Sequence, residues 1–129
     1  MTVGFNQWHK KNSLPKTQLL NKNWEWLSTI YHANKTISAK IPSKFTVNFQ
    51  ASGRVNFNTD CNKLSGNFKA TANNLSFDLN SLISTMMFCA NSQTEEFLEP
   101  LDKISHYSIN DQGQLILESQ PYKIQMIFK

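Results

Sequence analysis

Apolar and polar residues alternate along most of the chain from about residue 24 onward, and a period of two indicates half-buried β-strands. Trp24, Trp26 and Ser28 fall on one face of the first such run. Residues 44–50 (KFTVNFQ) alternate strictly, and residues 54–57 resume the pattern after Ser52-Gly53. Two alternating runs separated by a serine-glycine pair predict a β-hairpin.

The same alternation returns in short runs over the rest of the chain, at residues 67–70, 75–79, 106–109, 114–119 and 122–128. Polar turns at residues 72–74 and 110–113 and a break at Pro121 separate these runs. The side chains expected to face inward are Phe68, Leu75, Phe77, Leu79, Tyr122, Ile124, Met126 and Phe128. The count of predicted strands is seven or eight.

Residues 93–104 depart from the two-residue period and predict one short helix. The apolar side chains that share its inner face are Phe97, Leu98, Leu101 and Ile104. Ser92 followed by Glu95 fits a capping box at its start, whereas Pro100 should kink or end it near Glu99. We therefore expect a mainly β (α+β) domain. It should be a single curled antiparallel sheet or small β-barrel of about seven to eight strands, with one short helix near residues 93–104.

The chain has 129 residues, a length that fits one domain. Residues 1–19 lack periodicity and are expected to form a flexible polar and basic arm before a domain at residues 20–129. The chain contains no run of 18 apolar residues, so no transmembrane helix is predicted. The first twenty residues also lack the apolar core of a signal peptide, so an exported form would have lost its leader.

The net charge of +4 is unevenly distributed. Residues 1–63 contain nine lysine and arginine residues against two acids, whereas residues 64–129 contain four against seven. The basic residues are scattered rather than gathered with aromatic residues, and Arg54 is the one arginine. Because nucleic-acid binders usually concentrate both on one face, we expect no nucleic-acid partner.

No set of residues with the spacing of a catalytic or metal site emerges. The two cysteines are 28 positions apart, and the three histidines, His9, His32 and His106, lie in separate segments, so we expect no metal and no cofactor. Catalysis by a Cys61 thiol would require a base such as His106 to approach through the fold. The carboxylates Glu95, Glu96, Glu99 and Asp102 are expected to form the solvated face of the predicted helix.

In order along the chain, the segments are an aromatic first strand, FQASGRVNF, CNKLSGNF, LSFDLNSLISTMMFCAN, a helix and GQLIL before a final strand. Their most specific elements are two motifs, made of Cys61, Asn62, Ser65 and Gly66 and of Thr85, Met86, Met87, Cys89, Ala90 and Asn91. This order and these motifs resemble the META domain family, which includes the heat-inducible HslJ-like proteins of bacteria. Asp60 replaces a glycine that often precedes the first cysteine, and the lipidated cysteine of a lipoprotein leader is absent.

The resemblance implies a small β-rich domain, commonly exported to the bacterial envelope and often behind a lipoprotein leader. Heat shock and novobiocin resistance are associated with some members, and no enzymatic activity is settled for the family. In such a location Cys61 and Cys89 would form a disulfide; in the cytosol they would be two buried thiols. Met86, Met87 and Phe88 are expected in the core, although a methionine-rich patch would also suit an apolar groove. The other motif residues are expected to be structural, with Asn62 in a turn and Asn91 leading into the helix.

The resulting functional hypothesis is a non-catalytic, stress-associated envelope protein that binds a protein or apolar partner and is a monomer. The expected location is the periplasm or the outer membrane, with the cytoplasm as the alternative. The competing hypothesis is a thiol-dependent redox protein or enzyme that uses Cys61. Nine phenylalanines for so few strands favour an interior filled by side chains over a ligand cavity.

Overall fold

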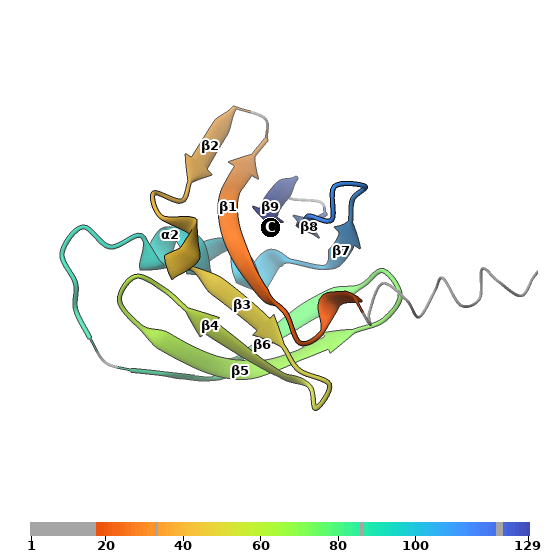
Figure 1. Cartoon of the computed structure of the whole chain (residues 1–129), viewed down its shortest axis with the longest axis horizontal. Helices are drawn as coiled ribbons and strands as arrows, with labels where there is room; N and C mark the ends of the chain where they lie inside the picture. Colours follow the sequence, from red (N-terminus) through yellow and green to blue (C-terminus); the bar gives the residue numbers. More distant parts are fainter. Residues whose placement is uncertain (1–17, 33, 86, 121–122) are drawn as a thin grey trace, which may run out of the picture.

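The computed structural model describes residues 18–32, 34–85, 87–120 and 123–129 and is built around one strongly curled antiparallel sheet (Figure 1). The strands are β1 (Asn23–Tyr31), β2 (Lys35–Ser38), β3 (Thr46–Phe49), β4 (Arg54–Asn58), β5 (Lys63–Ala70), β6 (Leu75–Ser84), β7 (His106–Ile109), β8 (Leu115–Ser119) and β9 (Ile124–Phe128). Eight strands follow the order β6-β5-β4-β3-β1-β9-β8-β7, and β2 pairs with β1 beside this path. The predicted fold class, a curled antiparallel sheet with one short helix, is confirmed.

The sheet is a half-barrel whose two edge strands meet at one end. The Leu75 amide donates to the Ser105 carbonyl (3.0 Å), and the Tyr107 amide donates to the Asn73 carbonyl (3.0 Å). An isolated bridge joins Asn74 to His106 at the same place. Beyond this junction β6 and β7 diverge, so the sheet curls around its core without closing along its length.

The helical segment fills the inside of the curl. Helix α2 (Thr94–Leu98) is followed directly by the 3-10 helix η2 (Glu99–Lys103), and a second 3-10 turn, η1 (Pro42–Lys44), precedes β3. Pro100 lies in the first turn of η2, where its missing amide is tolerated, so the α-helix ends as predicted near Glu99. Phe97 points from α2 into the interior and contacts the rings of Trp26, Phe45, Phe57 and Phe128.

Aromatic rings occupy the interior of the half-barrel. Neighbouring ring centroids in this cluster are 4.9 to 6.4 Å apart. The largest fully buried side chains are Trp24, Trp26, Phe45, Phe49, Phe57, Phe97 and Phe128. Contacts at these distances leave the rings in mutual van der Waals contact, so the interior is a packed core.

Two expectations about the first strand and its surroundings need correction. A register shift between Trp26 and Ser28 changes which side chains face the core, so that Thr29, and not Ser28, is buried beside the tryptophans. Leu19, expected in the flexible arm, is completely buried, and its carbonyl accepts a hydrogen bond from Trp24 Nε1 (3.0 Å). Residues 1–17 lie outside the described residues, as do Met86, Pro121 and Tyr122.

Candidate binding surface around the Cys61–Cys89 disulfide

The first motif begins in a tight turn that presents Cys61 and Asn62 to the second motif. Thr59 Oγ1 accepts hydrogen bonds from the backbone amides of Cys61 (3.1 Å) and Asn62 (2.7 Å). The Thr59 amide donates to the Asn62 carbonyl (2.8 Å) and closes the turn. A threonine that bonds to the amides following it is a local device for stopping a strand and reversing the chain.

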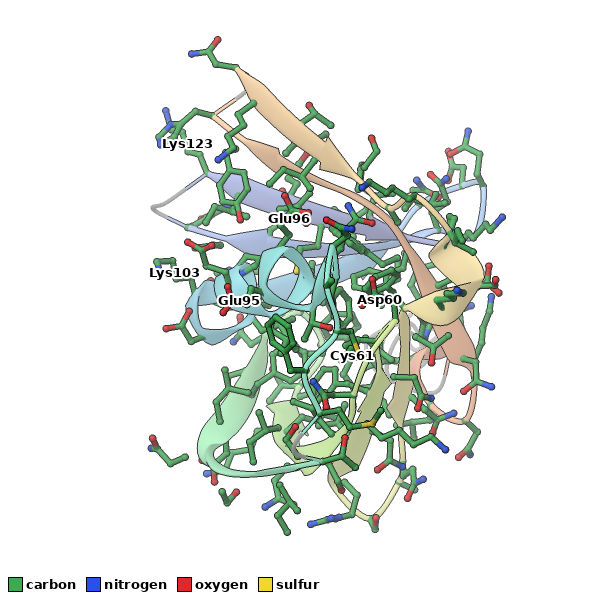
Figure 2. The ribbon with its side chains drawn as sticks, turned by 90° about the vertical axis from the view of Figure 1, so that its left-hand side faces the viewer. Asp60, Cys61, Glu95, Glu96, Lys103 and Lys123 are labelled. Carbon is green, nitrogen blue, oxygen red and sulfur yellow. A yellow bond between two sulfur atoms is a disulfide. The ribbon has the colours of Figure 1, made fainter. Side chains whose placement is uncertain are left out.

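A disulfide joins this turn to the segment before helix α2. The Cys61 and Cys89 sulfur atoms are 2.06 Å apart and the Cα atoms are 5.8 Å apart. Figure 2 shows Asp60 and Cys61 beside helix α2, with Glu95 and Glu96 on the helix itself. Both cysteines are half-buried, so the bond lies at the rim of the half-barrel.

Asn62 holds the residues before Cys89 with its side-chain amide. Its Oδ1 accepts hydrogen bonds from Thr85 Oγ1 (2.9 Å) and the Met87 amide (3.2 Å), and its Nδ2 donates to the Met87 carbonyl (3.5 Å). The side chain therefore pairs with residue 87 much as a neighbouring strand would. Thr85 completes the arrangement by accepting from the Lys63 amide (3.2 Å) and donating its own amide to the Lys63 carbonyl (3.1 Å).

Asp60, the residue that departs from the family pattern, connects the turn to the start of helix α2. Its carboxylate accepts hydrogen bonds from Ser92 Oγ (2.6 Å), the Gln93 amide (3.0 Å) and Thr94 Oγ1 (3.1 Å). Burial alone would raise the pKa of Asp60, but these hydrogen bonds, with Lys44 nearby, outweigh it and lower the pKa. The predicted capping box is wrong: Asp60 satisfies the amide of the N-cap residue Gln93, and Ser92 Oγ accepts from the amide of Thr94 (3.0 Å), not from that of Glu95.

Gln93 is a site residue that the sequence pattern did not reveal. It is buried, its Oε1 accepts from the Lys40 amide (2.9 Å), and its Nε2 donates to the Ser38 carbonyl (3.0 Å) and to Glu96 Oε1 (3.1 Å). These bonds fasten helix α2 to the segment between β2 and η1. No local signal marks the residue, because its backbone partners lie more than 50 positions earlier in the chain.

Ser65 and Gly66 lie in β5 and accommodate an irregularity in β6. Ser65 pairs with Ile83 and Asn67 pairs with Asp78, so residues 79–82 form a bulge opposite Gly66. A Cβ on Gly66 would be 3.1 Å from Leu82 Cδ1 and 3.5 Å from the Asp78 carbonyl. A side chain at position 66 would therefore crowd Leu82, whose side chain would have to shift. The Ser65 hydroxyl accepts a hydrogen bond from Arg54 Nη2 on the adjacent strand.

Met87 and Phe88 are exposed, which corrects the expectation that they belong to the core. Phe88 is 93% exposed, Met87 60% and Ile83, at the end of β6, 67%. Asn91 does not cap the helix with its side chain but adopts a left-handed backbone conformation (φ 61°), which asparagine tolerates better than most residues. We call residues 83–85 and 87–91 the signature loop.

Two surface hollows flank the signature loop. The first, of about 370 Å³, is lined by Ile83, Ser84, Thr85 and Lys63 among others. The second, of about 340 Å³, is lined by the disulfide, Asn62, Met87, Phe88 and Glu95 among others. Because Asn62 and Lys63 are consecutive and contribute to one hollow each, the two hollows are neighbours on the surface.

The remaining candidates for chemistry do not converge on this surface. His106 Nδ1 hydrogen-bonds to Ser105 Oγ (2.8 Å). Cys61 is bound to Cys89 in the disulfide. Among residues 18–32, 34–85, 87–120 and 123–129, no three His, Cys, Asp or Glu side chains are grouped so that they could hold a metal ion. Within the same part of the chain, no helix is long and apolar enough to cross a membrane.

Fold and surface together define a small half-barrel β-domain that carries a disulfide-anchored apolar loop. The chain belongs to the META domain family, whose family model matches residues 17–128. A search of curated proteins found no match.

Two solved structures from bacteria share the fold. One is the NMR structure of a protein from Burkholderia xenovorans, with 16% sequence identity and a TM-score of 0.70 over 100% of this chain and 90% of that chain. The other is the crystal structure of a DUF4847 family protein from Bacteroides vulgatus, with 15% identity and a TM-score of 0.67 over 88% of this chain and 94% of that chain. At such identities the similarity concerns the fold alone.

Proposed function

We propose that this META-domain protein is a non-catalytic, stress-associated protein of the bacterial cell envelope that binds a protein partner through the signature loop. One observation carries the proposal. Phe88 is 93% exposed although the disulfide and the Asn62 amide hold the backbone on both sides of it. A large aromatic side chain that is fixed and exposed is typical of a binding anchor.

The energetics favour recognition of a partner at this position. Burying a phenylalanine side chain contributes about 2 to 3 kcal/mol. Binding also costs entropy when a loop has to be ordered, and a loop that is already held avoids most of that cost. The Cys61–Cys89 bond and the hydrogen bonds of Asn62 to Thr85 and Met87 supply this order before any partner arrives.

The packed interior favours a surface partner over an apolar ligand held inside the half-barrel. The rings of Trp26, Phe45, Phe57 and Phe128 surround Phe97 where such a ligand would lie. The largest exposed apolar side chains gather instead around the signature loop, with Ile83, Met87 and Phe88 in one stretch and Ile41 elsewhere.

A disulfide supports the envelope as the compartment, since such bonds persist in oxidising surroundings and are rare in the cytosol. The association with stress rests on the family resemblance. Intact mass provides the test of compartment: protein purified without reductant should resist alkylation and weigh two mass units less than the reduced chain. Full labelling of both cysteines in protein taken directly from cells would contradict an envelope location.

Site-specific photo-crosslinking in the native cells tests the binding proposal. A benzophenone amino acid at position 88 should give a discrete protein adduct, and the same probe at Ile41, which is 48% exposed, serves as the matched control. The adduct should disappear when Asn62→Ala and loss of the disulfide release the loop. Equal adduct patterns at positions 88 and 41, or none at 88, would refute the proposed binding role.

A further inference from the structure

The surface around the signature loop combines apolar and acidic features at one end. Glu95 lines the same hollow as Phe88, and Glu96 lies beside it on helix α2. Glu99 and Asp102 extend the exposed acidic face along η2, where Lys103 Nζ lies 3.6 Å from Asp102 Oδ1. The hollow at the Phe88 end of the loop is therefore bordered by the carboxylate of Glu95, at the start of this acidic face.

The opposite end of the loop differs in charge. The hollow next to Ile83 is lined by Lys63 and by uncharged side chains, with no carboxylate among its lining residues. Thr85 lines this hollow and Met87 lines the other.

Building on the proposed function, we infer that the partner presents an extended peptide segment with two bulky apolar side chains, one for each hollow, and a lysine or arginine next to the one that meets Phe88. The apolar side chains fill the two hollows. The cation faces Glu95, where charges of opposite sign select the partner and its orientation. An anionic segment would be repelled by the carboxylates of α2.

Two other modes of binding fit the surface less well. Strand addition to the free edge of β6 would meet the bulge at residues 79–82, which interrupts the row of backbone groups that such a strand needs. Insertion of Phe88 into an anionic membrane would bring Glu95 and Glu96 close to negatively charged headgroups. An extended cationic peptide avoids both difficulties.

Selection of a random dodecapeptide phage library on the oxidised full-length chain tests the inference. Enriched peptides should carry two bulky apolar residues and a flanking lysine or arginine. A synthetic copy of the most enriched peptide, labelled for fluorescence anisotropy, should bind about tenfold more weakly to the Phe88→Ser variant. Ile41→Ser is the matched control, since it also removes an exposed apolar side chain and should leave the affinity unchanged.

Charge reversal tests the acidic contribution separately. Glu95→Lys should weaken binding about threefold to tenfold and reduce its salt dependence. Asp111→Lys makes the same charge change in the exposed turn between β7 and β8 and should have no effect.

The outcomes separate the inference from the proposed function. Peptides that need Phe88 but lack cations, and that tolerate Glu95→Lys, would overturn the inference and leave loop-mediated protein binding intact. If no peptide is enriched, or if binding ignores Phe88→Ser, both fail. Stronger Phe88-dependent binding to phosphatidylglycerol vesicles than to any selected peptide would overturn both in favour of a membrane.

Discussion

Removal of the Cys61–Cys89 disulfide should destabilise the domain by an amount that follows from its place in the chain. The bond closes a loop with a sequence separation of 28. On the chain-entropy model, releasing a loop of this length gives the unfolded state about 12 cal/mol/K, or about 3.6 kcal/mol at 25 °C. A domain of this size has a total stability of about 5 to 15 kcal/mol, so the loss would be a large fraction of it.

The double variant Cys61→Ala, Cys89→Ala makes this measurable by urea unfolding. Trp24 and Trp26 are fully buried, so their fluorescence should report the loss of the core. We expect the free energy of unfolding to fall by about 3 to 4 kcal/mol. The melting temperature should fall by roughly 10 to 18 °C. The dependence on urea should steepen, because the unfolded chain without the crosslink exposes more surface.

The wild-type protein unfolded in the presence of reductant is the control and should match the double variant. A loss below about 1 kcal/mol, with an unchanged urea dependence, would refute the chain-entropy reasoning for this loop. It would mean that residual contacts already restrict this loop in the unfolded chain.

Three further changes probe single contacts. Because the pKa of Asp60 is lowered, the stability it contributes is present above about pH 4 and is lost as the pH falls through the lowered value. Melting between pH 5 and 2 should therefore decline less for Asp60→Asn than for wild type, and parallel curves would contradict this. Gly66→Val should cost about 2 kcal/mol in urea unfolding by crowding Leu82, and Leu82→Ala should recover about half, whereas no recovery would point to another cause. The buried Ser119 hydroxyl has no hydrogen-bond partner in the described part of the chain, so Ser119→Ala should raise stability by about 1 kcal/mol, and a loss of that size would reveal an overlooked partner.

The fold was predicted well because most of the strands follow the two-residue alternation of apolar and polar side chains. The alternation around Phe45 and Phe57 gave the β3–β4 hairpin, and Gly53 takes the positive φ (94°) that its turn requires. The bulge after Trp26 was not foreseen, since a register shift depends on the partner strand β9 and leaves no mark in the period of β1.

The candidate site was predicted only in part, for a related reason. The importance of Cys61, Asn62 and Cys89 could be inferred from their motifs. The hydrogen bond that Asp60 accepts from the Gln93 amide, 33 positions later at the start of helix α2, could not be inferred, because that contact exists only in the folded chain. Phe88 was expected in the core on hydrophobicity alone. Its exposure follows from the hydrogen bonds of the Asn62 side chain to the backbone of Met87, which hold the loop with the Phe88 side chain outside.

The position of β9 in the sheet has a consequence for how the protein is made. β9 lies between β1 and β8, and Glu25 and Lys129 exchange two backbone hydrogen bonds of 2.9 Å each. The middle of the sheet is therefore completed by pairing residues about a hundred positions apart, so a half-synthesised chain exposes β1 as an unprotected edge. Such non-local pairing is slow and open to aggregation. The domain is therefore most exposed to aggregation before residues 124–128 have been synthesised.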